Sequence, residues 1–295
     1  NRVGRKYRNF VLRAIFEILS ACKTHMVAKR SVCDITIITI PSMFLVIPLI
    51  LISRKSFVVA DIRDLTWEYL PEDSFVGRLV KTAIGWFVDR GLKSAHAYTV
   101  TNEAEAEYVK TLSPCTPCFH LGNGISSKRF HDLVRLPVKL HKADTQVAYI
   151  GTVGIAQHLM TLVSAAELMP NIKFKIVGSG IEVASLKKYC HRKKMSNVVF
   201  YGSVSWEEIL KVYAESDLLY ANISENYLTA VPSKIFEYVS TGRHIIFGSK
   251  GISRKILSKF RGVCIINPDD VDELINAIDS FDKTSYEDFT DDNRS

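Results

Sequence analysis

The sequence predicts an α/β protein with two domains, each a parallel sheet wrapped on both sides by helices. Three observations support this. Apolar, β-branched runs alternate with segments of helical periodicity from residue 35 onward, the alternation occurs twice, and a basic, polar, Pro-containing stretch over residues 126–145 separates the two series. Strands that alternate with helices pair in parallel, because each helix returns the chain to the same edge of the sheet. Two Rossmann-like domains with a cleft between them are therefore expected.

The first series begins with a helix over residues 8–25, where apolar side chains recur at helical spacing. Residues 35–53 are uncharged and long enough to cross a bilayer. A strand, a break at Pro41-Ser42, a short helix and a second strand explain the same hydropathy if the sheet is buried on both faces. We favour this soluble interpretation. The other elements expected here are a helix over 74–94, a strand over 97–100, a helix capped at Thr101 or Asn102 that runs to 112, and a strand over 118–121 that ends at an Asn123-Gly124 turn.

The second series alternates more plainly. Strands are expected near residues 146–151, 172–177, 197–200, 217–222, 244–247 and 263–266. Helices are expected near residues 157–169, 181–194, 205–215, 232–240, 252–260 and 270–280, with Ser205 and Glu208 as a capping box. The domain boundaries predicted from these patterns are residues 1–132 for a first domain that lacks its N-terminal part, 133–145 for a linker, 146–280 for the second domain and 281–295 for an acidic tail.

Charge and cysteine content exclude some classes of protein. The net charge is +7, and residues 1–30 carry eight Lys or Arg against the single acid Glu17. No zinc-finger spacing or aromatic RNA-binding stretch accompanies these basic residues, so a nucleic-acid partner is disfavoured. Six cysteines lie mostly in apolar runs, which is typical of reduced, buried thiols in the cytosol.

Three glycine-rich turns follow successive strands of the second series. In an open parallel sheet, ligands bind at the carboxyl ends of the strands, where glycine lets a phosphate approach backbone amides. Glycine is also common at such turns only because the backbone is tightly bent there. This alternative, without a ligand, stays open for each of the three turns. The residues concerned are Gly151, Thr152, Val153 and Gly154 in the first turn, Gly178, Ser179 and Gly180 in the second, and Tyr201 and Gly202 in the third.

A sharper signal is the segment from Val231 to Gly242. Pro232 suits the first position of a helix, so the free amides of the segment Thr229, Ala230, Val231, Pro232 and Ser233 (Pro232 itself has none) would form a positive helix start. Lys234 precedes Glu237 by one turn. Either the two form an ordinary surface ion pair, or Lys234 binds a diphosphate while Glu237 accepts hydrogen bonds from sugar or ribose hydroxyls.

These segments resemble the donor domain of the family 4 glycosyltransferases of GT-B fold, and most closely the bacterial subgroup that adds amino sugars to surface polysaccharide precursors. The resemblance is carried by IGTVGIAQHL, KFKIVGSGIE, NVVFYGSVSWEEILKVYAESDLLY and VPSKIFEYVSTGRHIIF, and in the first domain by VVADIRDLTWEYL and HLGNGISSKRF. It implies a retaining transferase that uses a nucleotide-diphosphate sugar, with UDP as the nucleotide and no obligatory metal or other cofactor.

The same resemblance assigns residues to roles. Glu237 would bind the donor ribose and act with Lys234 in catalysis, the turn at residues 152–154 would meet phosphate or sugar, and the backbone near Tyr201 would hold the base. Asp61, Arg63 and Asp64 would face the acceptor, unless Arg63 merely pairs with one of the two aspartates.

Some positions depart from the family pattern. Thr229 stands where many relatives have a second glutamate, and Gln157 and His158 stand near the positions of an Arg and a Lys. Phosphate charge would then be met by amides, Lys234 and His158. A non-catalytic GT-B binding module and a GT-B nucleotide-sugar epimerase remain alternatives.

The acceptor is expected to be a saccharide linked to a polyprenyl lipid. The basic, amphipathic N-terminal helix would lie on the anionic inner leaflet of a membrane, or else pack on the first domain's sheet with a solvated basic edge. The location expected is cytoplasmic, peripheral on the membrane.

Overall fold

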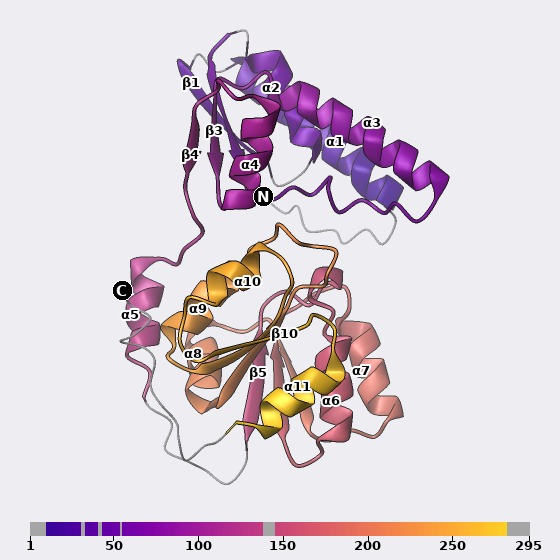
Figure 1. Cartoon of the computed structure of the whole chain (residues 1–295), viewed down its shortest axis with the longest axis vertical. Coiled ribbons are helices and arrows are strands. Elements are labelled where there is room, and N and C mark those ends of the chain that lie inside the picture. Colours follow the sequence, from indigo (N-terminus) through magenta and orange to yellow (C-terminus); the bar gives the residue numbers. More distant parts are fainter. Residues whose placement is uncertain (1–9, 31–32, 41–42, 54, 138–144, 282–295) are drawn as a thin grey trace. The chain divides into compact units, whose positions relative to one another are not determined.

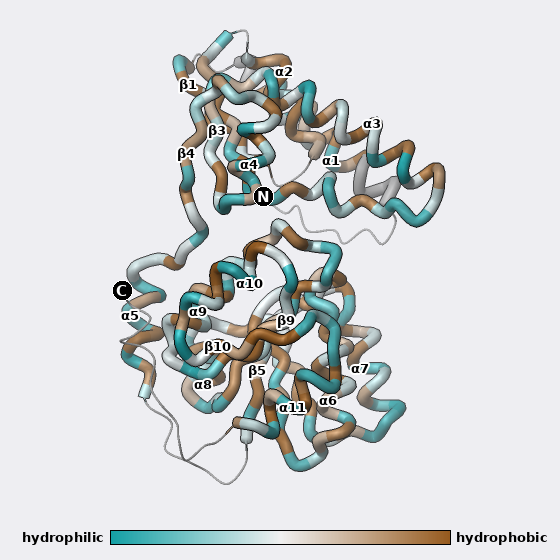
Figure 2. The backbone as a smooth tube through the Cα atoms, in the orientation of Figure 1, coloured by the Kyte–Doolittle hydropathy of each residue, from teal (hydrophilic) through white to brown (hydrophobic). Residues whose placement is uncertain are grey.

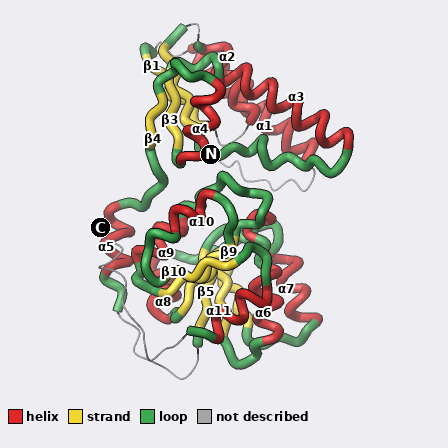
Figure 3. The backbone as a smooth tube through the Cα atoms, viewed as in Figure 1, coloured by secondary structure: helices red, strands yellow, loops and turns green. Residues whose placement is uncertain are grey.

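The computed structural model describes residues 10–30, 33–40, 43–53, 55–137 and 145–281 and forms two compact units, residues 1–122 and 123–295 (Figure 1). Each unit contains one all-parallel sheet flanked by helices (Figure 3). The prediction of two parallel α/β units is confirmed. The basic residues before Phe10, the expected acidic tail and most of the expected linker lie outside the described residues.

Unit 1 contains a four-stranded sheet in the order β1-β2-β3-β4. Its elements are α1 (Phe10–Arg30), β1 (Ile35–Ile40), a 3-10 turn (Met43–Leu45), α2 (Val46–Ile52), β2 (Phe57–Ile62), α3 (Phe75–Leu92), β3 (Ala97–Val100), α4 (Glu103–Leu112) and β4 (Cys118–His120). The side chain of Asn102 caps α4 by accepting a hydrogen bond from the Glu105 amide, as the sequence predicted. The expected Asn123-Gly124 turn does not form, and both residues lie in an irregular connection.

The uncharged run over residues 35–53 forms β1, the 3-10 turn and α2, as predicted. Within the part of the chain that the structure describes, no helix combines the length and the apolar character needed to cross a bilayer. The expectation that this segment is buried on both faces is wrong for β1. Ile38 and Ile40 of β1 are buried against the helices, but Ile35 and Ile37 are exposed on the opposite face of this edge strand.

Unit 2 contains a six-stranded sheet in the order β10-β9-β8-β5-β6-β7. Its elements are α5 (Ser127–Val134), β5 (Gln146–Ile150), a 3-10 turn (Ile155–Gln157), α6 (Met160–Leu168), β6 (Lys173–Val177), α7 (Val183–Arg192), β7 (Val198–Gly202), α8 (Trp206–Glu215), β8 (Leu218–Asn222), α9 (Lys234–Ser240), β9 (His244–Gly248), α10 (Ile252–Leu257), β10 (Val263–Ile266) and α11 (Val271–Asp279). Every strand and helix expected after residue 146 is present. Helix α5 was missed, because its residues were assigned to the polar stretch between the domains.

Two apolar cores hold the sheet of unit 2, one on each face. Helices α6, α7 and α11 cover one face, and α8, α9 and α10 cover the other (Figure 1). The capping box predicted at the start of α8 is present, with Ser205 accepting from the Glu208 amide and Glu208 accepting from the Ser205 amide. Not all thiols are buried as expected. All six are free, and Cys22, Cys33, Cys115 and Cys264 are exposed.

The two central strands of unit 2 separate before they end. Strands β5 and β8 pair only at Val147–Leu218 and Ala148–Leu219. Beyond this point the hydroxyl of Tyr238, from α9, lies between them. It accepts a hydrogen bond from the Ile150 amide (2.8 Å) and lies 3.2 Å from the carbonyl oxygens of Ile150 and Tyr220. A buried side chain thus satisfies the backbone groups that the divergence leaves unpaired.

Replacing Tyr238 with Phe removes this hydroxyl but keeps the ring. We expect the free energy of unfolding to fall by about 1–3 kcal/mol, because the buried Ile150 amide loses its acceptor. Urea denaturation measures the change. Tyr201→Phe, at an exposed tyrosine on the edge strand β7, serves as the control and should change the free energy by less than about 0.5 kcal/mol. Equal stability of Y238F and the unaltered protein would contradict the bridging role.

Candidate functional site

The order of strands in unit 2 marks the place where a ligand is expected. Strands β6 and β7 follow β5 on one side of the sheet. The chain then crosses back, and β8, β9 and β10 follow in order on the other side of β5. Open α/β sheets bind ligands outside the carboxyl ends of the two strands at which this reversal occurs. The candidate site of unit 2 is therefore the carboxyl ends of β5 and β8, beside Tyr238.

The three glycine turns predicted from the sequence meet at this edge, and they bond to one another. The Gly151 amide donates to the Val177 carbonyl oxygen (2.9 Å), the Val153 amide to Ser179 (3.0 Å) and the Gly178 amide to Gly202 (2.7 Å). A Cβ atom on Gly178 would lie 1.8 Å from the Gly151 oxygen, and one on Gly180 would lie 1.7 Å from the Val153 oxygen. Glycine is required here because the turns approach each other too closely for any side chain.

Because the turns bond to one another, fewer of their backbone amides are available to bind phosphate. The amides of Gly151, Val153 and Gly178 already have acceptors inside the protein. In the first turn, the amides of Thr152 and Gly154 donate none of those bonds and are available to a ligand. Tyr201 and Gly202 end β7, which lies two strands from β5 at the edge of the sheet.

Lys234 opens α9 and packs on β5. Its ammonium lies 3.9 Å from the centre of the Tyr149 ring and donates to the Tyr149 hydroxyl at 2.6 Å. That hydroxyl in turn donates to the Thr152 carbonyl oxygen. The Lys234 side chain is half-buried, and burial of its ammonium lowers the pKa to about 7 from the ordinary 10.5. A buried ammonium whose hydrogen-bond partner is a neutral phenol is costly to keep charged, which explains the direction of the shift.

Glu237 does not pair with Lys234, so the surface ion pair considered from the sequence is absent. Its carboxylate bonds instead to the Arg129 guanidinium of α5 at 2.6 Å and to the Tyr213 hydroxyl at 3.3 Å. The guanidinium of Arg129 also lies 4.7 Å over the ring of Trp206, whose indole nitrogen donates to Asp132. Lys234 and Glu237 are separated because α9 turns the lysine toward β5 and the glutamate toward α5.

The helix start predicted at Pro232 is wrong by two residues. Helix α9 begins at Lys234, and the Ile235 and Phe236 amides donate to the carbonyl oxygens of Pro232 and Ser233. These short-range bonds occupy two amides in the first turn of α9, next to the residues 229–233 that the sequence interpretation assigned to phosphate. Residues 229–233 form a loop held by Asn123, which donates to the Val231 oxygen at 3.2 Å, and by Ser253, which donates to the Ala230 oxygen.

His158 lies at the end of the 3-10 turn that follows β5, near this site. Its Nδ1 atom is 3.0 Å from the Asp269 carboxylate. Glu225, in the loop between β8 and α9, forms an exposed ion pair with Lys250 at 2.7 Å. No group of three or more His, Cys, Asp or Glu side chains within the described ranges is placed to hold a metal ion.

In unit 1 the predicted acceptor residues lie at the carboxyl end of β2 and directly after it. Arg63 pairs with Asp61 at 2.9 Å, as one of the two sequence interpretations expected. Burial acts to raise the pKa of Asp61, but hydrogen bonds from Thr99 and Arg63 outweigh it and the pKa is lowered. Burial raises the pKa of Asp64 despite a hydrogen bond from the Tyr69 hydroxyl at 2.6 Å.

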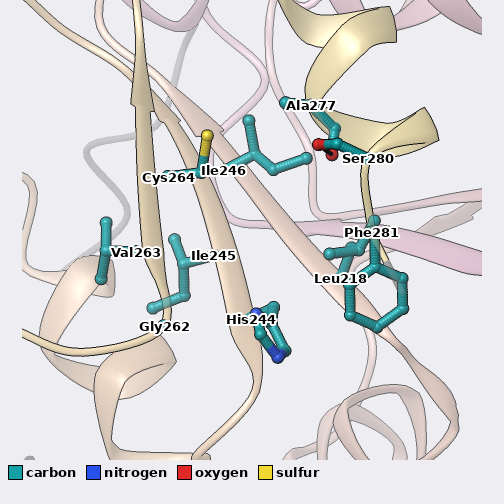
Figure 4. Close-up of a pocket in the computed structure, with 10 residues that line it drawn as sticks. All are labelled: Leu218, His244, Ile245, Ile246, Gly262, Val263, Cys264, Ala277, Ser280 and Phe281. Atoms are coloured by element: carbon teal, nitrogen blue, oxygen red, sulfur yellow. Dashed lines mark hydrogen bonds between the residues drawn. The ribbon is translucent and has the colours of Figure 1, made fainter. Parts of the chain in front are cut away.

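A cavity of about 330 Å³ lies at the opposite edge of the unit 2 sheet (Figure 4). It is lined by the first residues of β8, β9 and β10, including Leu218, His244 and Val263, and by Phe281 after α11. None of the predicted site residues lines it. Because these are the amino ends of parallel strands, the cavity is distinct from the candidate site.

Sequence reasoning missed three residues of the site. Tyr149 was counted only as part of a strand, Arg129 fell in the presumed linker, and Asp269 follows β10 in a turn. The Asn267-Pro268-Asp269-Asp270 segment consists of turn-forming residues, so the sequence could have predicted a sharp turn here. It could not have predicted that Asp269 contacts His158.

Comparison with known proteins shows what this chain is similar to. Residues 144–281 match the family described as Glycosyl transferases group 1. No curated protein sequence matches the chain. Sucrose-phosphate synthase from Thermosynechococcus elongatus has a similar structure, with a TM-score of 0.75 and 16% identity over 100% of this chain and 75% of that chain.

Two further structures of similar fold contain UDP. A TarM variant from S. aureus in complex with fondaparinux, alpha-GlcNAc-glycerol and UDP has a TM-score of 0.59 and 16% identity over 82% of this chain. This chain spans 47% of the length of that TarM chain. Anabaena HepE in complex with UDP and glucose has a TM-score of 0.64 and 14% identity over 98% of this chain and 78% of that chain.

At such identities the structural likeness shows the fold, which is GT-B. Residues 144–281 match a family of glycosyl transferases, and the fold of the chain is that of the GT-B structures. The predicted fold class is confirmed. The particular sugar and acceptor are the subject of the proposal below.

Replacing Lys234 with Met tests the buried charge. The folded-state pKa of Lys234, about 7, lies below its ordinary 10.5. Between these values the unfolded chain binds more protons at this site, so stability rises with pH by up to about 1.4 kcal/mol per pH unit. The free energy of unfolding of the unaltered protein, relative to K234M, should therefore increase from pH 7 to pH 9 in urea denaturation.

The matched control for this experiment is Lys250→Met, because Lys250 is an exposed lysine paired with Glu225. The pH dependence of unfolding should be the same for K250M as for the unaltered protein. Parallel pH profiles for K234M and the unaltered protein would contradict a buried, charge-depleted Lys234.

Proposed function

We propose that the protein is a retaining glycosyltransferase that moves an N-acetylated amino sugar from a UDP-sugar to a lipid-linked saccharide in surface polysaccharide biosynthesis. The observation that carries the proposal is the environment of Lys234. Its ammonium lies beside the carboxyl end of β5, where ligands of this fold class bind, and its partner is a neutral phenol. A diphosphate would supply the missing negative charge and favour the protonated lysine.

Glu237 is the proposed ligand of the donor ribose. An ionised carboxylate has about four acceptor positions. Arg129 and Tyr213 account for two of them, one on each oxygen. Positions therefore remain for ribose hydroxyls, and the two protein donors would hold the carboxylate in a single orientation. Its side chain is 16% exposed, which is enough for contact with a ligand at the surface of α9.

In this proposal, catalysis consists of positioning and of stabilising charge on the leaving diphosphate. Lys234 and the amides of Thr152 and Gly154 would supply positive charge and hydrogen bonds. The retaining outcome and the amino sugar are supported by the sequence resemblance. The UDP nucleotide is supported by its presence in the TarM and HepE structures.

The acceptor side of the proposal is supported by an apolar surface on α3 of unit 1. Phe75 and Trp86 are 75% and 69% exposed, and Leu79 is 61% exposed. Exposed Arg78 and Arg90 flank them on the same helix, and Figure 2 shows hydrophobic and hydrophilic residues alternating along α3. Helix α1 likewise exposes Ile15, Ile18 and Leu19. These three belong to the apolar side chains that recur at helical spacing in the sequence, but they do not face the core.

A helix that exposes aromatic and aliphatic side chains between arginines suits the interface of an anionic membrane. We propose that unit 1 binds the cytoplasmic face of such a membrane, where a polyprenyl-linked acceptor would be located.

A non-catalytic binding module is favoured by one observation. Several amides that phosphate-binding turns usually present are bonded within the protein, namely those of Gly151, Val153, Gly178, Ile235 and Phe236. This alternative predicts UDP binding without release of UDP from a UDP-sugar in the presence of a lipid-linked saccharide acceptor. The proposed transferase predicts both.

Calorimetric titration with UDP, GDP and ADP tests the donor site. We expect saturable binding of UDP and at least tenfold weaker binding to Glu237→Ala, because one charge-assisted contact contributes about 1.5–3 kcal/mol. Glu225→Ala removes an exposed carboxylate of the neighbouring loop and should leave the affinity unchanged. Failure of the unaltered protein to bind any of the three nucleotides would refute the donor site.

Flotation with lipid vesicles tests the membrane surface. The unaltered protein should float with vesicles that contain anionic phospholipid, less so as salt is raised, because charge is screened. Leu79→Glu combined with Trp86→Glu should abolish flotation. Glu107→Lys, on exposed α4, raises the net charge without altering α3 and controls for nonspecific attraction. Unchanged flotation of the α3 variant would exclude this helix as the binding surface.

A further inference from the structure

A strongly basic surface lies on α7 of unit 2, outside the site already described. The helix lies beside α6 and buries Leu186 and Cys190 in the core on that face of the sheet (Figure 1). From Lys187 onward its exposed residues are basic, and residues 183–200 contain no Asp or Glu. We define the α7 basic face by four exposed side chains, those of Lys187, Lys188, Arg192 and Lys194.

One carboxylate compensates part of the charge in this region. Glu167, near the end of α6, bonds to the Lys193 ammonium at 2.6 Å and accepts from the Tyr189 hydroxyl at 2.6 Å. Within the part of the chain that the structure describes, no ion pair joins a carboxylate to the four side chains of the α7 basic face. The face therefore presents net positive charge to the solvent.

The positions of these charges do not favour the helix itself. Lys188 and Arg192 are four residues apart and lie on the same side of α7, where like charges repel. A cation in the last turn of a helix interacts favourably with the helix dipole, and this accounts for Arg192. It does not account for Lys187 and Lys188, which lie in the middle of α7. Their charge needs another explanation.

Lys194 occupies a position where glycine would fit better. Its φ angle is 54°, in the left-handed region. Its amide donates to the His191 carbonyl oxygen at 3.1 Å, and the Met195 amide donates to the Cys190 carbonyl oxygen at 3.0 Å. Helices that end with this pair of bonds usually have glycine at the left-handed residue, because glycine has no Cβ atom. Here the chain has a charged side chain instead, at a cost in backbone strain.

The charged groups spread over the surface and do not converge. The Lys187 ammonium lies 5.6 Å from the centre of the Phe200 ring, which belongs to β7. The Arg192 guanidinium lies 5.3 Å from the centre of the Tyr189 ring on the same helix. A site for one phosphate needs donors directed at the same point, as in a bidentate Arg contact. Separated charges suit a surface that carries many anions.

The aromatic rings near these charges are not open for stacking. Arg192 and Lys193 lie over Tyr189, and Lys187 lies over Phe200. Proteins that bind single-stranded nucleic acid combine a basic groove with aromatic rings on which bases stack. This surface has the charges without the open rings, so a membrane of anionic phospholipid fits it better than a nucleic acid does.

An exposed apolar side chain lies at the margin of this surface. Leu168 ends α6 and is 65% exposed. It follows Glu167, which is bonded to Lys193 and so lies against the end of α7. Basic side chains beside an apolar one are typical of surfaces that contact the headgroup layer of a membrane.

We propose that the α7 basic face binds the headgroups of an anionic phospholipid membrane. The inference rests on the proposed membrane-bound acceptor, and it adds an electrostatic contact on unit 2 to the apolar surface on α3. The attraction acts through separate charges and is screened within about 10 Å at 0.1 M salt. It strengthens membrane binding but does not anchor the protein by itself, because stable binding requires a second, apolar signal.

Partitioning onto lipid vesicles tests the contact in the full chain. The vesicles contain phosphatidylcholine alone or mixed with phosphatidylglycerol. Lys187→Gln, Lys188→Gln and Arg192→Gln combined should weaken partitioning onto the anionic vesicles at least tenfold at low salt, because each Lys or Arg near such a surface strengthens binding about fivefold. The difference should vanish at about 1 M salt, where the screening length is about 3 Å. UDP binding should be unchanged.

The matched control is Lys211→Gln, Arg254→Gln and Lys259→Gln combined. It lowers the net charge by the same amount, but these exposed residues lie on α8, on α10 and just after α10, which cover the other face of the sheet. This control should partition nearly as the unaltered protein does.

Lys194→Gly separates folding from binding. Glycine relieves the strain at a left-handed position, so the midpoint of urea denaturation should rise. Loss of the charge should weaken partitioning onto anionic vesicles about fivefold. A variant that is more stable but binds less well is not expected if Lys194 serves only the end of the helix.

The outcomes separate this inference from the proposed function. If the α7 triple variant partitions no more weakly than the control, the α7 contact is wrong and the apolar surface on α3 stands. If the α7 variant loses partitioning and Leu79→Glu with Trp86→Glu does not, the α7 contact is supported and the α3 surface is wrong. Binding of a single-stranded oligonucleotide that the α7 variant loses, without any loss of vesicle partitioning, would assign the face to nucleic acid and overturn the proposal.

Discussion

The arrangement of unit 2 depends on one hydroxyl between two diverging strands. Strands β5 and β8 stop pairing after Ala148 and Leu219, and Tyr238 satisfies the backbone of Ile150 where they part. This contact fixes α9 against the sheet. Lys234 lies one turn earlier on the same face of the helix and therefore reaches Tyr149, the neighbour of Ile150 on β5. The Tyr238 contact therefore does two things. It stabilises the gap between β5 and β8 where a ligand is expected, and it holds α9, which supplies the charged groups of the site.

Charge is distributed unevenly around this opening. Glu237 is neutralised by Arg129, and Asp269 is surrounded by the donors Asn222, Ser224 and His158. Lys234 has a phenol as its partner, and burial lowers its pKa to about 7. A protein selected for stability alone would have little reason to keep such a lysine, since burying an uncompensated charge is unfavourable. The cost is understandable if an anionic ligand offsets it, and this is the physical basis of the proposed donor site.

Much of the fold could be predicted from the sequence, because in unit 2 the residues of most apolar runs are the ones that the structure buries. The run QVAYI is a strand with four buried residues, and Ser205 with Glu208 caps α8 as its spacing indicated. Unit 1 was less predictable. The β-branched pattern of β1 indicated a strand buried on both faces, but its edge position leaves Ile35 and Ile37 exposed. The start of α9 was also misplaced, because Pro232 is compatible with a helix start but the packing of Ile235 and Tyr238 sets where the helix begins.

By itself, the sequence determined the alternation of strands and helices, the glycine turns and the presence of Lys234 and Glu237 in one segment, since these depend on residue type and short-range spacing. Tertiary structure alone decided their partners. Arg129 and Glu237 are separated by 108 residues in the chain, and His158 meets Asp269 only because β5, β8 and β10 end at the same edge of the sheet. Contacts between distant segments follow from strand order and helix packing, and no local pattern specifies these.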